Sequence, residues 1–174
     1  NPVPNASFNT IQLDTCKIPA SFDFMNSSNG AFAYTWDFGD GSTSNTPNLT
    51  YSYSLEGTYI INLSAMNVYG CVDSSSSTII VSPVPNADFS YIKSDTCVLP
   101  SNYNFTNLTT GGDLFSWDFG DGSNSYLTSP SHGYSSEGIY NVQLNVSNTY
   151  GCSDSLTEVL NVNPIPNSSF NVVQ

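Results

Sequence analysis

The sequence predicts an all-β protein built from two tandem β-sandwiches, and two observations lead to this prediction. First, the chain repeats itself. NPVPNASF begins at residue 1, SPVPNADF at residue 82 and NPIPNSSF at residue 163, so both intervals are 81 residues (82 − 1 and 163 − 82). Second, apolar and polar residues alternate inside each copy, which is typical of strands with one face in a core. No segment has the sustained three-and-four apolar spacing of an amphipathic helix.

The alternation identifies the strands of each copy. In the first copy it runs over residues 34–38, where Tyr34, Trp36 and Phe38 point inward, and over residues 59–65. The second copy repeats both segments at 115–119 and 140–147. Further strands are expected near residues 6–12, 21–26, 50–53 and 73–81, between turn-rich segments. About seven short strands in roughly 80 residues predict an immunoglobulin-like β-sandwich.

The repeat also predicts the domain organisation. We expect one sandwich over residues 1–81, a second over 82–162, and the truncated start of a third repeat over 163–174. Two prolines at each junction favour extended backbone, so the connections should be short and stiff. A fragment of a longer array is the expected context, and neighbouring repeats of the same chain are the expected partners.

Composition excludes several classes of partner. The net charge is −12 and only two residues, Lys17 and Lys93, are basic, so no cationic surface is available for nucleic acid or anionic lipid. No apolar run approaches the roughly 20 residues that cross a bilayer, so direct membrane insertion is not expected. The N-terminus lacks a signal-peptide pattern, and any targeting segment is expected outside this sequence.

Each copy contains two cysteines separated by 55 positions (71 − 16 and 152 − 97). This spacing favours disulfides over zinc, which requires closely spaced ligand pairs. We therefore predict one intradomain disulfide in each sandwich, Cys16 with Cys71 and Cys97 with Cys152. Disulfides imply an oxidising compartment, so the protein is expected outside the cell or on its surface.

The heptapeptide WDFGDGS occurs twice, at residues 36–42 and 117–123. The favoured interpretation is a structural turn, in which the glycines adopt positive φ and the aspartates accept backbone hydrogen bonds. The alternative is a Ca²⁺ site of looser design than an EF-hand. The turn residues are Trp36, Asp37, Gly39, Asp40 and Gly41, then Trp117, Asp118, Gly120, Asp121 and Gly122. The candidate Ca²⁺ ligands are Asp37, Asp40, Asp73, Asp118, Asp121 and Asp154.

These motifs resemble the polycystic kidney disease (PKD) domain family. YTWDFGDGS and FSWDFGDGS are similar to the family's characteristic turn, and the alternating strands that end at NVYG and NTYG match its later pattern. The resemblance covers essentially the whole chain and implies non-catalytic β-sandwiches. The first copy has Tyr51 where the family usually has histidine, present in the second copy as His132. The cysteines and proline-rich junctions are similar to tandem arrays in large surface proteins of Bacteroidetes-type bacteria, including gliding-motility adhesins.

The expected function is non-catalytic. Only one histidine is present, and we interpret it as a packing or turn residue. The main hypothesis is a stalk or spacer in a large extracellular protein, with a contribution to adhesion. The alternative is a carbohydrate-binding accessory module of a secreted enzyme that degrades polysaccharide or protein, with surface polysaccharides or proteins as ligands. Its candidate contacts are Tyr51, Tyr69, Tyr126 and Tyr150, whose rings could stack on a sugar.

Overall fold

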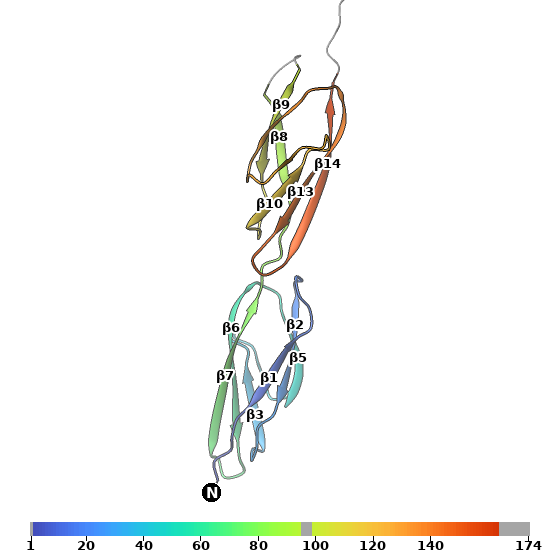
Figure 1. Ribbon diagram of the computed structural model, residues 1–174. Coiled ribbons are helices and arrows are strands. Elements are labelled where there is room, and N and C mark those ends of the chain that lie inside the picture. The colour runs from blue at the N-terminus through green and yellow to red at the C-terminus, as the bar shows by residue number, and fades with distance from the viewer. Residues whose placement is uncertain (1, 95–98, 164–174) are drawn as a thin grey trace, which may run out of the picture. The chain divides into compact units, whose positions relative to one another are not determined.

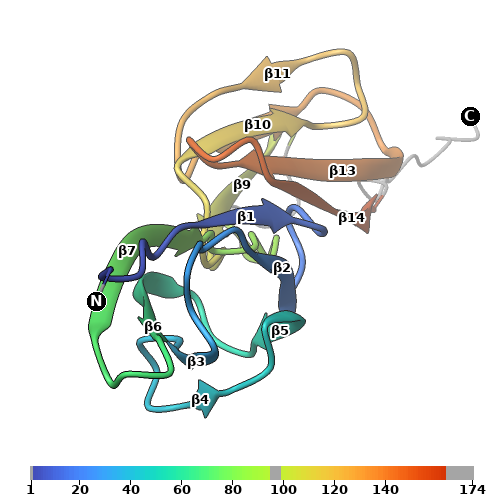
Figure 2. The ribbon, with the colours of Figure 1, turned by 90° about the horizontal axis from the view of Figure 1, so that it is seen from below.

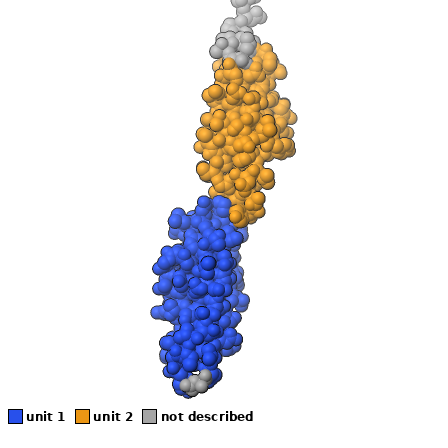
Figure 3. All heavy atoms as spheres, turned by 90° about the vertical axis from the view of Figure 1, so that its left-hand side faces the viewer, with its two compact units in different colours: residues 1–83 blue, residues 84–174 orange. Residues whose placement is uncertain are grey.

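The computed structural model describes residues 2–94 and 99–163 and divides into two compact units, Asn1–Pro83 and Val84–Gln174 (Figure 3). Among the described residues, each unit has seven strands, most of which are labelled in Figure 1. The described residues include no helix that is long and apolar enough to span a membrane. The start of the expected third repeat, residues 164–174, lies outside the described part of the chain.

The first unit is a sandwich of two antiparallel sheets. Its strands are β1 (Phe8–Gln12), β2 (Ala20–Asn26), β3 (Ala33–Asp37), β4 (Thr43–Ser44), β5 (Asn48–Tyr53), β6 (Gly57–Met66) and β7 (Val72–Val81). One sheet has the order β1-β2-β5 and the other β4-β3-β6-β7. Seen from below, these strands form a ring (Figure 2). The buried side chains of both sheets make up one core cluster. The all-β sandwich prediction is confirmed.

The second unit repeats this topology in the same order. Its strands are β8 (Phe89–Lys93), β9 (Ser101–Asn107), β10 (Leu114–Asp118), β11 (Asn124–Ser125), β12 (Ser131–Tyr134), β13 (Gly138–Ser147) and β14 (Ser153–Val162). The sheets are β12-β9-β8 and β11-β10-β13-β14. The register also repeats, since Trp36 pairs with Leu63 in β3–β6 and Trp117 with Leu144 in β10–β13.

Each core is centred on the tryptophan of the repeated heptapeptide. Trp36 and Trp117 are completely buried. Trp117 packs edge-on against Phe89, with ring centroids 5.0 Å apart, and Trp36 packs in the same way against Phe8, also at 5.0 Å. Because side chains of a strand alternate between its two faces, β6 buries Ile61, Leu63 and Ala65 while the residues between them face outward.

Two short strands were not expected from the sequence. β4 and β11 have two residues each, and they extend the larger sheets by pairing with β3 and β10. Such segments are too short for an alternation pattern to be detected. The predicted strand at 6–12 begins at Phe8 in the structure, because Asn5 makes only an isolated bridge, to Asn29.

Candidate functional site

The WDFGDGS segment forms a tight turn at the end of β3 and, in the second unit, of β10. Asp37 Oδ1 accepts a hydrogen bond from the Gly39 N–H (2.9 Å), and Asp40 Oδ1 accepts one from the Ser42 N–H (2.9 Å). Asp118 and Asp121 accept the equivalent bonds in the second unit, at 2.8 and 3.0 Å. The aspartates therefore replace backbone carbonyls in closing the turn.

In each turn the second aspartate, Asp40 or Asp121, uses its other carboxylate oxygen to bind a side chain on the opposite sheet. Tyr51 on β5 donates its hydroxyl proton to Asp40 Oδ2 at 2.7 Å. At the same place in the second unit, His132 Nε2 lies 2.7 Å from Asp121 Oδ2. Tyr and His are therefore interchangeable here, since each binds an aspartate and links the turn to the other sheet.

The rings of these two residues also occupy the same place. Tyr51 stacks on Phe38 with centroids 4.0 Å apart, and His132 stacks on Phe119 at 4.1 Å. Both planes are nearly parallel, at 3° and 7°. The Asp40–Tyr51 and Asp121–His132 pairs were missed in the sequence, although the same 11-residue separation occurs in both copies.

These contacts change the acidity of the turn aspartates. Burial by itself raises the pKa of Asp121, but hydrogen bonds from His132 and Ser123 outweigh it and lower the pKa below its usual value of 3.8. The pKa of Asp40 is lowered in the same way, with hydrogen bonds from Tyr51 and Ser42 outweighing burial. Each carboxylate is thus held in its charged form.

Acid should weaken the second unit partly through Asp121. A carboxyl whose folded pKa is depressed stabilises the fold above its unfolded pKa, and this contribution is lost as pH falls through the folded pKa. We expect Asp121→Asn to be less stable than the wild type at pH 6, with a difference that shrinks below about pH 4. Urea denaturation of both proteins from pH 2.5 to pH 7 measures this difference in the free energy of unfolding. Asp88→Asn, at an exposed carboxyl, is the control, and a difference independent of pH would contradict the expectation.

The six candidate Ca²⁺ ligands do not form one cluster in either unit. Asp37 of β3 pairs with Asn62 of β6. Asp73 of β7 pairs with Ala65 of β6, which is three residues further along the same strand. Asp73 Oδ2 instead accepts the Ala6 N–H at 2.8 Å, and Asp154 Oδ2 accepts the Ala87 N–H. Within residues 2–94 and 99–163 no three acidic, histidine or cysteine side chains are grouped for a metal ion. Ca²⁺ binding stays a prediction.

The predicted disulfide between Cys16 and Cys71 is wrong, because Cys71 carries a free thiol. Cys16 and Cys152 are both disulfide-bonded. Cys97, the predicted partner of Cys152, lies outside the described residues, so that pairing stays a prediction.

The fold explains why Cys16 does not pair with Cys71. Cys71 belongs to the β6–β7 turn, which lies beside the start of β1: the Asn67 side chain donates to the Pro2 carbonyl at 2.8 Å, and Asp73 binds Ala6. Cys16 follows the far end of β1. From residue 6 to residue 13 an extended chain advances about 24 Å, and disulfide Cα atoms lie within about 7 Å. The two cysteines therefore lie at opposite ends of one sandwich.

The four candidate tyrosines differ in accessibility. Tyr51 is half-buried, and Phe38 covers one face of its ring. Tyr69 and Tyr150 are exposed in the β6–β7 and β13–β14 turns, at 65% and 53%. Tyr126, after β11, is 80% exposed. Tyr126 lines a groove.

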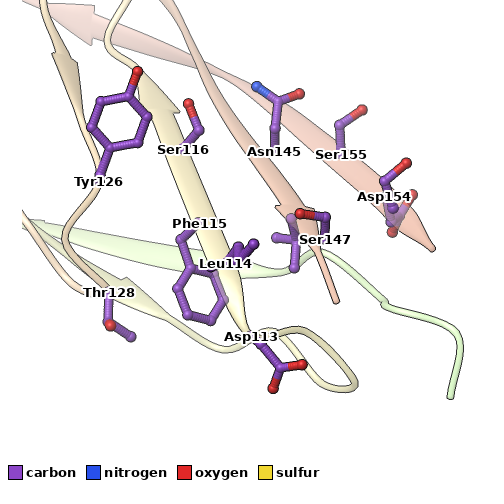
Figure 4. Close-up of a pocket in the computed structure, with 12 residues that line it drawn as sticks. Asp113, Leu114, Phe115, Ser116, Tyr126, Thr128, Asn145, Ser147, Asp154 and Ser155 are labelled. Carbon is purple, nitrogen blue, oxygen red and sulfur yellow. The ribbon is translucent and has the colours of Figure 1, made fainter. Parts of the chain in front are cut away.

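This groove, of about 880 Å³, lies in the second unit over β10, β13 and β14 (Figure 4). Its aromatic residues are Tyr126 and Phe115, and its polar residues include Ser116, Asn145 and Ser155. The first unit has a smaller hollow of about 390 Å³, in which Asn45 takes the place of Tyr126. The groove is therefore larger in the second repeat, where Tyr126 adds an aromatic ring. Sequence reasoning identified Tyr126 as a candidate contact. It assigned Phe115 to the core face of its strand and did not single out Asn145, because alternation does not tell which residues share a hollow.

Comparison with known proteins places these features in a family. A family model described as "PKD domain" matches residues 1–81 and 80–163, nearly the whole chain. A microbial collagenase from Vibrio alginolyticus is 48% identical over 44 residues, which are 25% of this chain and 5% of the collagenase.

Two similar solved structures are also PKD domains. The PKD1 domain of Vibrio anguillarum Epp is 28% identical, with a TM-score of 0.41, and the match covers 47% of this chain and 95% of that domain. The PKD1 domain of the Vibrio cholerae metalloprotease PrtV is 31% identical, with a TM-score of 0.40 and coverage of 45% and 96%. The two matches of the family model, one for each repeat, establish that this chain belongs to the PKD domain family.

Proposed function

We propose that the two repeats are non-catalytic spacers of a large extracellular protein, which hold an adhesive or enzymatic domain away from the cell surface. The observation that carries the proposal is the repetition itself, since both units have the same strand order and the same register. The disulfide-bonded state of Cys16 and Cys152 also fits an oxidising, extracellular setting. The single histidine of the chain supports the proposal as well, since its Nε2 is occupied by Asp121.

Disulfides give such a spacer a mechanical property. When tension acts on the two termini, the residues between two bonded cysteines are shielded from extension, and Cys16 and Cys152 are both bonded. A spacer held in this way keeps more of its reach when a repeat unfolds.

Single-molecule pulling on the two-repeat protein tests the spacer proposal. We expect the reduced chain to extend further than the oxidised chain on complete unfolding, by about 3.6 Å for each residue between two bonded cysteines. Under oxidising conditions Cys16→Ser should extend further than the wild type, because Cys16 is bonded. Cys71→Ser is the matched control and should behave like the oxidised wild type, because Cys71 is not bonded. Equal extension of oxidised and reduced wild type would contradict the proposal.

A second candidate function is carbohydrate binding at the groove of the second repeat. The specific observation is the exposed Tyr126 ring beside Asn145 and Ser155, since a flat aromatic ring can stack on a sugar while amides and hydroxyls bind its hydroxyl groups. If the repeats bind carbohydrate, we propose that they are an accessory module of a secreted enzyme that degrades polysaccharide or protein. The adhesin of a gliding bacterium stays a prediction, because the relatives reported above come from Vibrio species.

Glycan arrays probed with the two-repeat protein test this second function. We expect Tyr126→Ala to weaken binding roughly tenfold or more, since an anchoring aromatic typically contributes at least 1.4 kcal/mol. Tyr69→Ala, at an exposed ring outside the groove, should leave binding unchanged. Binding that survives Tyr126→Ala, or an array without any bound glycan, would remove this candidate.

A further inference from the structure

A straight row of polar side chains crosses the larger sheet of the second unit. Ser116 of β10 pairs with Asn145 of β13, and Asn145 pairs with Ser155 of β14. Paired residues of neighbouring strands project from the same face of a sheet. Figure 4 shows these three side chains pointing to one side, and all three line the groove described above.

Tyr126 extends this row by one position. β11 pairs Ser125 with Trp117, so the next residue along the chain, Tyr126, stands beside Ser116. Figure 4 shows its ring on the same side as Ser116, and the ring is 80% exposed. The row spans three strand intervals of about 4.8 Å each, which together measure about 14 Å. We call these four residues the cross-strand row: Tyr126, Ser116, Asn145 and Ser155.

The cross-strand row offers uncharged hydrogen-bonding groups beside an aromatic ring. The Asn145 side chain is exposed and carries both donors and an acceptor, and each serine hydroxyl can donate and accept. A sugar ring has hydroxyl groups at its edge and C–H groups on its faces, so it matches this combination of partners. The strand interval is also close to the length of one sugar in an extended chain, so about three sugars span the row.

The charges around the row select against acidic ligands. Asp113 and Asp154 line the same groove. Asp118 is exposed and lies on β10, two residues beyond Ser116. Lys93, by contrast, belongs to β8 in the other sheet. A carboxylate or sulfate on a ligand would therefore be repelled by these aspartates.

The first unit has a different row in the same place. Thr35 of β3 pairs with Ser64 of β6, and Ser64 pairs with Ser74 of β7. Asn45 stands at the position of Tyr126. The Thr35 hydroxyl donates to the Asn45 side-chain oxygen at 3.1 Å, so two polar groups of this row already bind each other. The aromatic end of the row therefore distinguishes the second repeat from the first.

We propose that the cross-strand row binds an extended, neutral polysaccharide of β-1,4-linked hexoses, which runs across β10, β13 and β14 with one sugar stacked on Tyr126. The inference rests on the second candidate function, carbohydrate binding at the groove, and adds the class of ligand and the direction of its chain. An extended polymer fits because the row is straight, and a neutral polymer fits because aspartates surround the row. Affinity rises with chain length up to about three or four sugars and then levels off.

Calorimetric titration of the two-repeat protein with β-1,4-linked manno- and gluco-oligosaccharides, from dimer to hexamer, tests the proposal. We expect Asn145→Ala to weaken binding roughly three- to tenfold, because its amide no longer bonds the sugar. Asn141→Ala is the matched control and should leave binding unchanged. Asn141 is exposed on the same face of the same strand but lies outside the groove.

A charged probe tests the selection against acidic ligands. Oligosaccharides of β-1,4-linked mannuronate differ from the manno-oligosaccharides by a carboxylate on each sugar, and we expect them to bind roughly tenfold more weakly or less. Urea denaturation of each variant confirms that it is folded.

Three results would overturn the proposal: mannuronate that binds as tightly as the neutral series, equal effects of Asn145→Ala and Asn141→Ala, or no binding of either neutral series. If Tyr126→Ala still abolishes binding of a carbohydrate on the glycan array, carbohydrate binding at the groove stands while the cross-strand row fails. The two proposals can therefore fail separately.

Discussion

Gly120→Ala is expected to destabilise the second unit by about 3 to 5 kcal/mol, because two penalties act together. Gly120 has a φ of +77°, a conformation that residues with a Cβ rarely adopt. A Cβ at this position would also lie 2.6 Å from the carbonyl oxygen and 2.9 Å from the nitrogen of Asn141 on β13. Neither atom can move without displacing the backbone of the central strand.

Gly122→Ala separates the two penalties. Gly122 belongs to the same turn and has a φ of +90°, but a Cβ there meets no atom within 4 Å. We expect it to cost about 1 to 2 kcal/mol, the conformational part alone. Urea denaturation followed by Trp117 fluorescence measures both variants, in a Trp36→Phe background that leaves one tryptophan. If both variants lost the same free energy of unfolding, the close approach of Gly120 to β13 would not contribute to stability.

Trp117→Ala is expected to cost about 3 to 5 kcal/mol, the usual range for deletion of a buried tryptophan. The side chain is completely buried against Phe89 and Phe105, with ring centroids at 5.0 and 5.6 Å. Its indole N–H also donates to the Leu127 carbonyl at 3.0 Å, which would lose this partner. The loss of stability therefore has two causes, the cavity left by the indole and the unsatisfied carbonyl of Leu127.

The same variant tests whether each repeat has its own core. Urea denaturation followed by circular dichroism should show about half of the β signal lost at lower urea concentration, since the first unit is centred on Trp36. Tyr126→Ala removes an aromatic ring that is 80% exposed and should change stability by less than about 0.5 kcal/mol. A single transition shifted as a whole would contradict separate cores.

Most of the fold could be predicted because its signals are local. Alternation along 59–65 and 140–147 depends only on which face of a strand is buried, and the buried Leu63 and Leu144 confirm it. The WDFGDGS segment is equally local, since its aspartates bind backbone N–H groups only two residues ahead. The two-residue strands β4 and β11 could not be predicted, because pairing with β3 and β10 defines them.

The disulfide pattern could not be predicted from spacing. Two cysteines in an 81-residue repeat suggest a bond within that repeat, but spacing along the chain does not tell which end of a sandwich each cysteine occupies. The contacts of Asn67 with Pro2 and of Asp73 with Ala6 place the Cys71 turn at one end, and β1 leads to Cys16 at the other.

Peptide mapping of the unreduced two-repeat protein tests the central claim most directly. The chain has 14 acidic residues, so cleavage at aspartate and glutamate separates the peptides of its cysteines. Free thiols are alkylated first, and linked peptides are identified by mass spectrometry before and after reduction. The account predicts complete alkylation of Cys71, with Cys16 and Cys152 both recovered in linked peptides. A linked pair of Cys16 with Cys71 would contradict it.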